Sequence, residues 1–284
     1  MHEAALRAAA FGGDPSCPPA ATASPATPLA ALLAAIVLGA QGRYAAAATF
    51  LAALRRGPDL LLTSLASSSL VAHRSQLGGH AAARALDGEA YALAVGLQTE
   101  PDPDGLDAAG ARTDALLGLA ADNLALGRLA AARRLAARAA DENAGWRAEV
   151  RGGWVGAEIE LAAGRGTEAI APARRARETA VAREAKRHVV KSGIVLAVAL
   201  RAADVPDHRT ITDTLVGNAL DDCEKYELFS LLWPALLVGA ELQPGHAEDY
   251  RFRLAQVLHA VLRSADPCGR RIAGESPWVP AGGS

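Results

Sequence analysis

Cysteine is scarce in this sequence of 284 residues, and its spacing argues against two common structural devices. The chain holds Cys17, Cys223 and Cys268, which are odd in number and far apart, and no Cys-x-x-Cys pair occurs. A disulfide framework or a zinc ribbon needs regularly spaced cysteines. We therefore expect neither a disulfide-stabilised fold nor a structural zinc site.

Long hydrophobic runs are also missing. The longest, from Leu29 to Ala40, ends at Gln41-Gly42-Arg43, whereas a membrane-spanning helix needs about 20 apolar residues. The first residues, Met1-His2-Glu3, lack the basic region that opens a signal peptide. These features predict a cytoplasmic protein with no membrane partner.

Aromatic residues make up only 4% of the chain, whereas alanine accounts for about a quarter of it. Alanine has the highest helix propensity because it loses no side-chain entropy in a helix. The sequence therefore predicts an all-α protein with a thin core of alanine and leucine. The formal net charge is −2, so no overall field attracts nucleic acid, and we expect no direct nucleic-acid partner.

Proline and glycine divide the chain into three parts. Residues 1–28 are rich in both, so we expect a mostly disordered segment, followed by a helical domain at 29–264 and a flexible tail at 265–284. Within the domain the sequence predicts about six antiparallel helix hairpins. Their helices are expected at residues 29–39, 44–56, 59–77, 80–97, 108–126, 128–141, 145–163, 167–181, 183–203, 206–222, 223–242 and 244–264.

Four glycines mark turns between these helices, and an alanine follows each of them five residues later. The glycines are separated by 36, 49 and 37 residues, and the longest interval contains an acidic, proline-rich loop at 98–106. The pairs are Gly42 with Ala47, Gly78 with Ala83, Gly127 with Ala132, and Gly164 with Ala169. Residues 29 to about 181 thus resemble the tetratricopeptide repeat (TPR), a helical hairpin with a period of 34 residues. The resemblance implies a right-handed α-solenoid.

TPR arrays usually bind peptides or partner proteins in a concave groove formed by the first helix of each hairpin, and the resemblance implies the same here. The groove residues would be Asn123, Arg147, Arg151, Trp154 and Glu160. The ordered set of Lys, Asn and Arg with which some TPR proteins capture a C-terminal carboxylate is not recognisable. The sequence therefore gives no basis for a claim of such capture.

Each of three sequence features is consistent with two interpretations. Trp146 and Trp154 lie on one helical stripe, where they either fill a core layer or anchor a partner. The basic residues between Arg165 and Lys191 form either a solvated outer helix face or a basic protein-binding patch. Trp278, among prolines, either packs back on the last helix as a cap or serves as a recognition peptide.

No catalytic or metal-binding motif is recognisable. The stretch Gly164-Arg165-Gly166-Thr167-Glu168-Ala169 resembles a dinucleotide-binding loop, but it follows a helix where that motif needs a strand. His73 and His80 lie on either side of one turn with no third ligand evident. We expect a protein without enzymatic activity and without a cofactor.

Together these patterns predict a protein-interaction module, a scaffold or regulatory adaptor that binds a peptide or partner protein. Self-association between a basic middle and acidic flanks is a further hypothesis. Two alternatives remain: a sensor or effector-binding subunit of a transcription-regulatory or signalling system, and an enzyme with an unrecognised helical active site. A deep cavity with convergent ionisable groups would favour catalysis, and a long open groove would favour binding.

Overall fold

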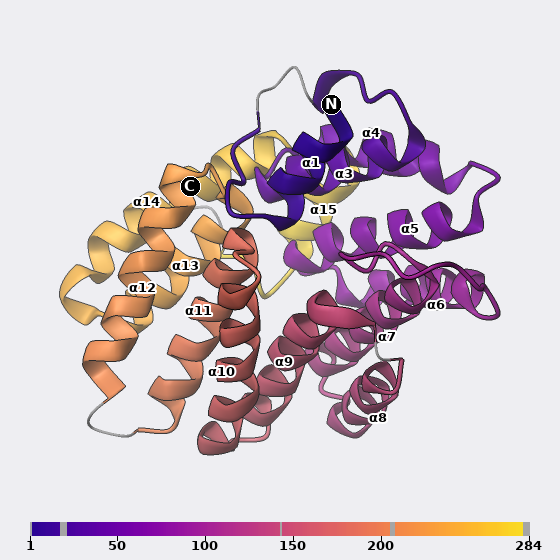
Figure 1. The fold of residues 1–284 in the computed structure, drawn as a ribbon. Coiled ribbons are helices and arrows are strands. Elements are labelled where there is room, and N and C mark those ends of the chain that lie inside the picture. The colour runs from indigo at the N-terminus through magenta and orange to yellow at the C-terminus, as the bar shows by residue number, and fades with distance from the viewer. Residues whose placement is uncertain (1, 18–21, 143, 205–207, 281–284) are drawn as a thin grey trace.

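The computed structural model describes residues 2–17, 22–142, 144–204 and 208–280, and this part of the chain contains helices but no β-strand. The prediction of an all-α fold is confirmed. Among the described residues, no helix combines the length and apolar character that crossing a membrane requires. The helices, labelled as in Figure 1, are α1 (His2–Phe11), α3 (Pro28–Ala40), α4 (Tyr44–Arg55), α5 (Leu60–Gln76), α6 (His80–Ala94), α7 (Ala108–Ala125), α8 (Leu129–Ala140), α9 (Gly145–Ala162), α10 (Gly166–Ala182), α11 (Lys186–Ala202), α12 (His208–Lys225), α13 (Phe229–Leu242), the 3₁₀ turn η1 (Pro244–His246), α14 (Ala247–Arg263) and α15 (Pro267–Glu275).

Several helices begin at a capping side chain. The side-chain oxygens of Thr27, Asp59 and Asp107 each accept the backbone N–H three residues later, at 3.1, 3.0 and 2.7 Å. These bonds satisfy donors that have no partner within the first turn of α3, α5 and α7. The sequence predicts that the domain and its first helix begin at residue 29, and α3 begins one residue earlier, at Pro28.

The four turn glycines adopt one conformation. Their φ angles are 72°, 83°, 72° and 73° at Gly42, Gly78, Gly127 and Gly164, a region that a Cβ atom makes costly. At each turn the glycine N–H bonds to the carbonyl three residues earlier, and the next N–H bonds to the carbonyl five residues before it. This pair of hydrogen bonds is the Schellman motif, which ends a helix by satisfying its last carbonyl groups.

Small residues after these turns let the paired helices approach closely. Ala47, Ala83, Ala132 and Ala169 are each at most 1% exposed. The same Schellman bonds occur at Glu184 and Glu227, whose φ angles are 50° and 53°. No glycine marks these turns in the sequence, and the break expected after Asp222 lies instead between α12 and α13. The helix start expected at Pro206 falls outside the described residues.

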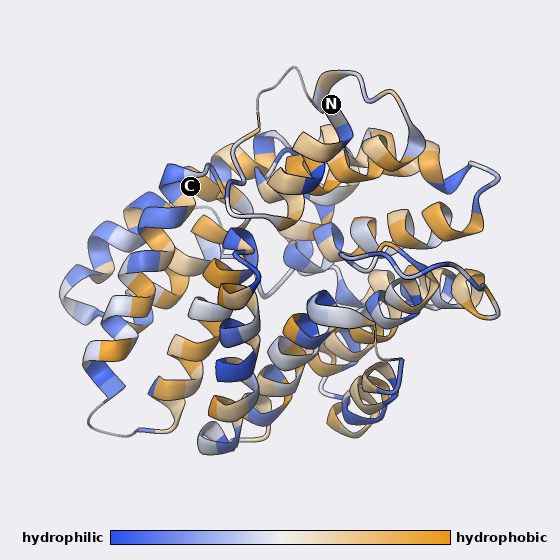
Figure 2. Cartoon of the chain, viewed as in Figure 1, coloured by the Kyte–Doolittle hydropathy of each residue, from blue (hydrophilic) through white to orange (hydrophobic). Residues whose placement is uncertain are grey.

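The helices pack in sequence and form a ring (Figure 1). Helices α3, α5, α7, α9, α11 and α13 contact one another in that order, and α13 contacts α3. The helix between each of these pairs packs on both of its neighbours in the chain. Helix α3 is apolar around its whole circumference (Figure 2), which is typical of a helix surrounded by protein.

Polar contacts join the two ends of the array. The Ala45 N–H donates to the Ser264 carbonyl at 2.8 Å, and Gln76 Nε2 donates to the Ser230 carbonyl at 3.3 Å. Arg74 of α5 forms an ion pair with Asp266, the residue that caps α15. The first and last helices of the array are therefore held together.

The N-terminal segment is more ordered than the sequence suggested. Residues 1–28 were expected to be mostly disordered, but α1 packs on α3 and α11 and buries Leu6, Ala9, Ala10 and Phe11. These residues lie on one face of a helix, and Gly12-Gly13 follow it. Arg7, on α1, forms ion pairs with Asp102 and Asp104 of the acidic loop.

The C-terminal segment also carries structure where a flexible tail was expected. Helix α15 begins at Pro267, and Ala273 and Val279 are buried. Ser276 contacts the Gly78 turn, whereas Trp278 keeps 58% of its surface exposed. The tail therefore covers the turn between α5 and α6 with Ser276 and the Cβ atom of Trp278, while more than half of the Trp278 surface stays exposed.

Candidate functional site

A cavity of about 340 Å³ lies inside the ring. The six helices that contact one another around the ring, here called the inner helices, are α3, α5, α7, α9, α11 and α13. Each contributes to the cavity wall, and Phe11 of α1 also lines it. Representative lining residues, one for each inner helix, are Ile36, His73, Gly118, Trp154, His188 and Leu231. This cavity occupies the position that a concave groove would take in an open array.

The structure brings three of the five predicted groove residues into this cavity, namely Arg147, Arg151 and Trp154. The other two lie in the last turns of their helices and face elsewhere. Asn123 Nδ2 donates to the Leu119 carbonyl of its own helix at 2.7 Å. Glu160 forms ion pairs with basic side chains of α8 and of the turn before α10.

Arg147 holds the acidic loop and α1 against the ring. Its Nε donates to the Asp104 carbonyl at 2.7 Å, and its Nη2 donates to the Gly105 carbonyl at 2.9 Å. The guanidinium carbon also lies 5.5 Å from the centre of the Phe11 ring. The remaining nitrogen, Nη1, donates to Asp114. Because all three guanidinium nitrogens have protein partners, Arg147 acts mainly as a structural anchor.

One carboxylate serves both arginines of α9. Asp114 of α7 pairs with Arg147 at 2.8 Å through one oxygen and with Arg151 through the other. Asp114 is buried, and a carboxylate with two cationic partners balances only one of their charges. Glu158, on the same helix as the arginines, also lines the cavity, so the two carboxylates together balance the two arginines of the α9 wall.

Two further cations enter the cavity from α11. Arg187 and Lys191 lie one turn apart, and neither forms an ion pair within the described chain. Both keep some accessible surface, and the protein atoms around them remove part of their hydration. This desolvation, followed by the charges of Arg147 and Arg151, lowers the pKa of Arg187 to about 10. Desolvation likewise lowers the pKa of Lys191.

Aromatic rings surround His188 and fix one end of the cavity. The His188 ring lies 5.7 Å from the Trp154 ring in a stacked arrangement and 5.0 Å from the Trp146 ring. Desolvation and the nearby cations lower the pKa of His188 well below its usual value, so this imidazole is neutral at pH 7. In the described part of the chain, its Nδ1 has no hydrogen-bond partner.

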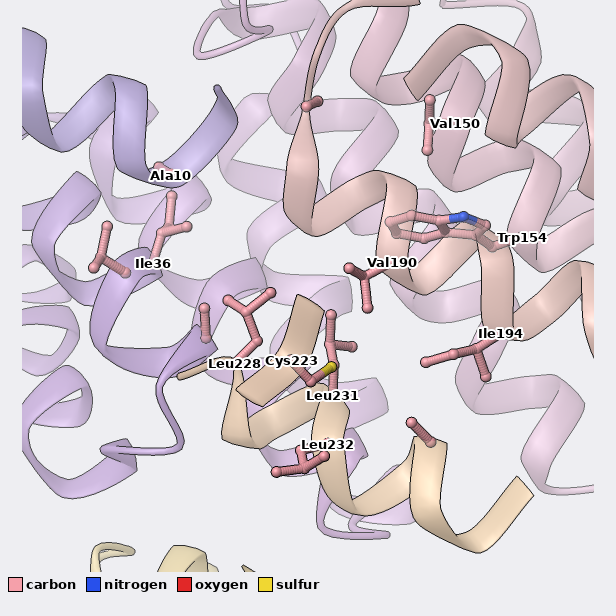
Figure 3. Packing of buried hydrophobic residues seen from close by; sticks show 14 of the residues in the cluster. Ala10, Ile36, Val150, Trp154, Val190, Ile194, Cys223, Leu228, Leu231 and Leu232 are labelled. Carbon is pink, nitrogen blue, oxygen red and sulfur yellow. The ribbon is translucent and has the colours of Figure 1, made fainter. Parts of the chain in front are cut away.

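Both tryptophans of the α9 stripe belong to the core, and one also lines the cavity. Trp146 Nε1 donates to the Pro103 carbonyl at 3.1 Å, and Trp154 Nε1 donates to Ser192 Oγ at 2.8 Å. Figure 3 shows the Trp154 indole against α11, near Val190 and Ile194. Lys191 Nζ lies 4.6 Å from the centre of the Trp154 ring. Trp154 therefore serves packing and the cavity wall together.

The opposite wall is polar and comes from α5 and the start of α6. His80 Nδ1 lies 2.9 Å from Asp122 Oδ1, and Ser75 Oγ donates to the same oxygen at 3.0 Å. His73 instead packs 5.1 Å from the Tyr44 ring, and desolvation lowers its pKa to about 3. The described residues hold no group of three or more metal-donor side chains.

Behind this wall lies a carboxyl group that sequence analysis did not single out as a site. Asp87 of α6 is 1% exposed, and neither of its oxygens has a hydrogen-bond partner among the described residues. It occupies the space that a side chain at Gly118 would need. Desolvation, and next the charge of Asp122, raises the pKa of Asp87 to about 9.

The sequence leaves the basic residues between Arg165 and Lys191 as either an outer helix face or a protein-binding patch, and the structure corrects the outer-face interpretation for Arg187 and Lys191. Arg174, Arg175 and Arg183 do lie on the exposed side of the array. Helix α11, however, is an inner helix, so its cations face the cavity. Counting hairpins beyond residue 181 would have indicated this, since the first helix of each hairpin faces inward.

Comparison with known proteins identifies no matching protein-family model and no matching curated protein.

Proposed function

We propose that this chain is a binding module that holds a ligand in the cavity at the centre of its ring, as the sensor or effector-binding part of a regulatory system. The observation that carries the proposal is the convergence of charged side chains from α7, α9 and α11 on one cavity. Arg187 and Lys191 of α11 form no ion pair among the described residues, although the charges of Asp114 and Glu158 reach them, so a bound anion would supply the direct partner that they lack.

The size of the cavity supports a small ligand. A volume of about 340 Å³ falls in the range of small-molecule sites, about 300 to 1,000 Å³. A partner protein predicted from the sequence would engage this site only through a short terminal segment. The proposal therefore favours the sensor hypothesis over a scaffold that binds a long peptide.

We also propose that the array is a TPR-like, right-handed solenoid of six hairpins whose ends meet. The repeated Schellman turns and the buried alanines that follow the turn glycines support this architecture.

A second candidate, an enzyme acting on the ligand, has a specific observation in its favour. His80 lines the cavity and is paired with Asp122, and a carboxylate that orients an imidazole is a common arrangement for a general base. Convergent ionisable groups in a cavity are the feature that favours catalysis. Turnover of p-nitrophenyl phosphate or p-nitrophenyl acetate that His80→Gln removes would support this candidate over binding alone.

A thermal-shift screen of small molecules tests the proposed function. A ligand at 100 times its Kd stabilises the native state by about 2.7 kcal/mol, which raises the Tm of a chain of this size by about 5–10 °C. Ala72→Trp provides the blocked cavity, because Ala72 is an exposed residue of α5 at the cavity wall. Ala53→Trp, on the exposed side of α4, is the matched control.

The expected result is a set of compounds that raise the Tm of the wild type and of Ala53→Trp but not of Ala72→Trp. If no compound raises the Tm, or if the compounds that do so stabilise all three proteins equally, the cavity is not a binding site.

A further inference from the structure

The charge of the cavity wall identifies a ligand class, an inference that rests on the proposed function. The lining contains Arg147, Arg151, Arg187 and Lys191 against two carboxylates, Asp114 and Glu158. These six side chains give the wall a surplus of two positive charges, although the whole chain has a net charge of −2. The surplus is therefore a local property of the cavity.

The surplus is concentrated at the boundary between α9 and α11. Arg151 is one turn after Arg147 on α9, and Lys191 is one turn after Arg187 on α11. The two helices contact each other. Asp114 serves the α9 pair, whereas the α11 pair has no carboxylate within ion-pair distance in the described residues. Arg187 Nε is buried and lacks a hydrogen-bond partner there.

Uncompensated cations in such a place have a cost that the fold does not explain. A desolvated charge is unfavourable unless an opposite charge or hydrogen bonds balance it. Arg187 lies among positive neighbours, and the lowered pKa values of Arg187 and Lys191 reflect this environment. Because Asp114 and Glu158 act on α11 without forming an ion pair with Arg187 or Lys191, these side chains are suited to an anion that enters from outside.

We propose that Arg151, Arg187 and Lys191 bind the oxyanion group, a carboxylate or a phosphate monoester, of a small organic ligand. Guanidinium groups donate two parallel hydrogen bonds to such groups, and an ammonium adds a further donor. Arg147 is already committed to the loop carbonyls and supports the site through Asp114.

The other lining residues indicate the chemical character of the rest of the ligand. Apolar side chains, including Ile36, Leu117, Val155 and Leu231, line the cavity beside the charged groups. The Trp154 indole is held in place by its bond to Ser192 Oγ and gives the cavity a rigid aromatic surface. An anion with an aromatic or aliphatic body matches both parts of the lining.

The chain offers a direct spectroscopic probe, because Lys186, Lys191 and Lys225 are its only lysines. Protein labelled with ¹³C at lysine Cε gives three signals, which Lys→Arg variants assign. The probes are phenyl phosphate, benzoate and the neutral benzamide, compared at constant ionic strength. We expect both anions to move the Lys191 signal and raise its apparent pKa, while Lys225, at a fully exposed site, stays unchanged.

Charge-removing variants measure the contribution of each donor. Arg187→Gln removes a lining cation, and Arg174→Gln removes an exposed cation of α10 as the matched control. Loss of one charged hydrogen-bond partner weakens binding by about tenfold or more, so Arg187→Gln should weaken anion binding to that extent and Arg174→Gln should not. Lys191→Met should raise the Tm of the ligand-free protein and reduce its stabilisation by the anions. If Lys191→Met fails to fold, the Arg187→Gln comparison decides alone.

The outcomes separate this inference from the proposed function. If benzamide binds as tightly as the anions, and Ala72→Trp removes its binding, the cavity is a binding site but the oxyanion inference is wrong. If the three lysine signals respond equally, or Arg187→Gln binds the anions as the wild type does, the inference is also overturned. Failure of all three probes to bind contradicts it as well. Tighter binding of phenyl phosphate or of benzoate then identifies the preferred oxyanion.

Discussion

Asp87 provides a quantitative prediction about stability. Its carboxyl is buried between α6 and α7, and its pKa is raised from 3.8 to about 9. At pH 7 the native protein keeps this proton, whereas the unfolded chain releases it. The group is therefore destabilising above the unfolded pKa, by about 1.36 kcal/mol for each pH unit. Between pH 3.8 and pH 7 this amounts to about 4 kcal/mol.

Substitution of Asp87 by Asn keeps the shape and removes the titration. We expect Asp87→Asn to increase the free energy of unfolding by about 4 kcal/mol at pH 7 and by about 1–2 kcal/mol at pH 5. The sign follows from the raised pKa, because the native state binds the proton more tightly than the unfolded state does. Asp87→Ala should behave similarly; Asp87 lies nine residues after the turn glycine Gly78, and alanine stands at that position after Gly127 and Gly164.

Urea unfolding followed by circular dichroism at several pH values measures this difference. The result that refutes the account is a difference between wild type and Asp87→Asn that does not change from pH 5 to pH 7. A variant less stable than the wild type at pH 7 would show that Asp87 is ionised and paired in the native state.

Three further predictions concern contacts around the cavity. Gly118→Ala should destabilise the protein by about 1–3 kcal/mol, because a Cβ there would lie 2.0 Å from Asp87 Oδ2; a double-mutant cycle with Asp87→Ala should recover most of the loss, and additive effects would contradict this contact. Arg147→Gln should cost about 3–5 kcal/mol in urea unfolding, because it leaves two loop carbonyls and one bond of Asp114 without their partner; an unchanged midpoint would show that the loop is held otherwise. Deletion of residues 266–284 should cost roughly 2–4 kcal/mol through the loss of the Arg74 ion pair and of buried apolar surface, and unchanged stability would argue that the tail is not a cap.

The sequence predicted the four turns of the repeat from their positive-φ glycines, but it placed Gly96 and Gly145, which also have positive φ, inside the helices expected at 80–97 and 145–163. Gly42, Gly127 and Gly164 mark such positions because other residues adopt that conformation at a cost. Glu184 and Glu227 adopt it as well, but nothing in their side chains shows this. The repeat therefore stopped being recognisable near residue 181, although the helices continue with the same kind of turn.

Tertiary contacts explain the other differences. The apolar face of α1 was hidden in a segment whose overall composition is dominated by proline and glycine. Arg187 and Lys191 have the same residue types as the exposed Arg174 and Arg175, and only the closing of the ring decides which of them face inward. Helical spacing in the sequence indicates Trp154 and Arg151, but only the folded ring brings the charged groups of α7, α9 and α11 together at one cavity.

A crystal structure of the protein with bound phenyl phosphate tests the central claim most directly. The account predicts the phosphate oxygens within hydrogen-bonding distance of Arg187 and Lys191, with the phenyl ring on the apolar wall of the cavity. An empty cavity, or a phosphate bound only at exposed arginines such as those of α10, would contradict it.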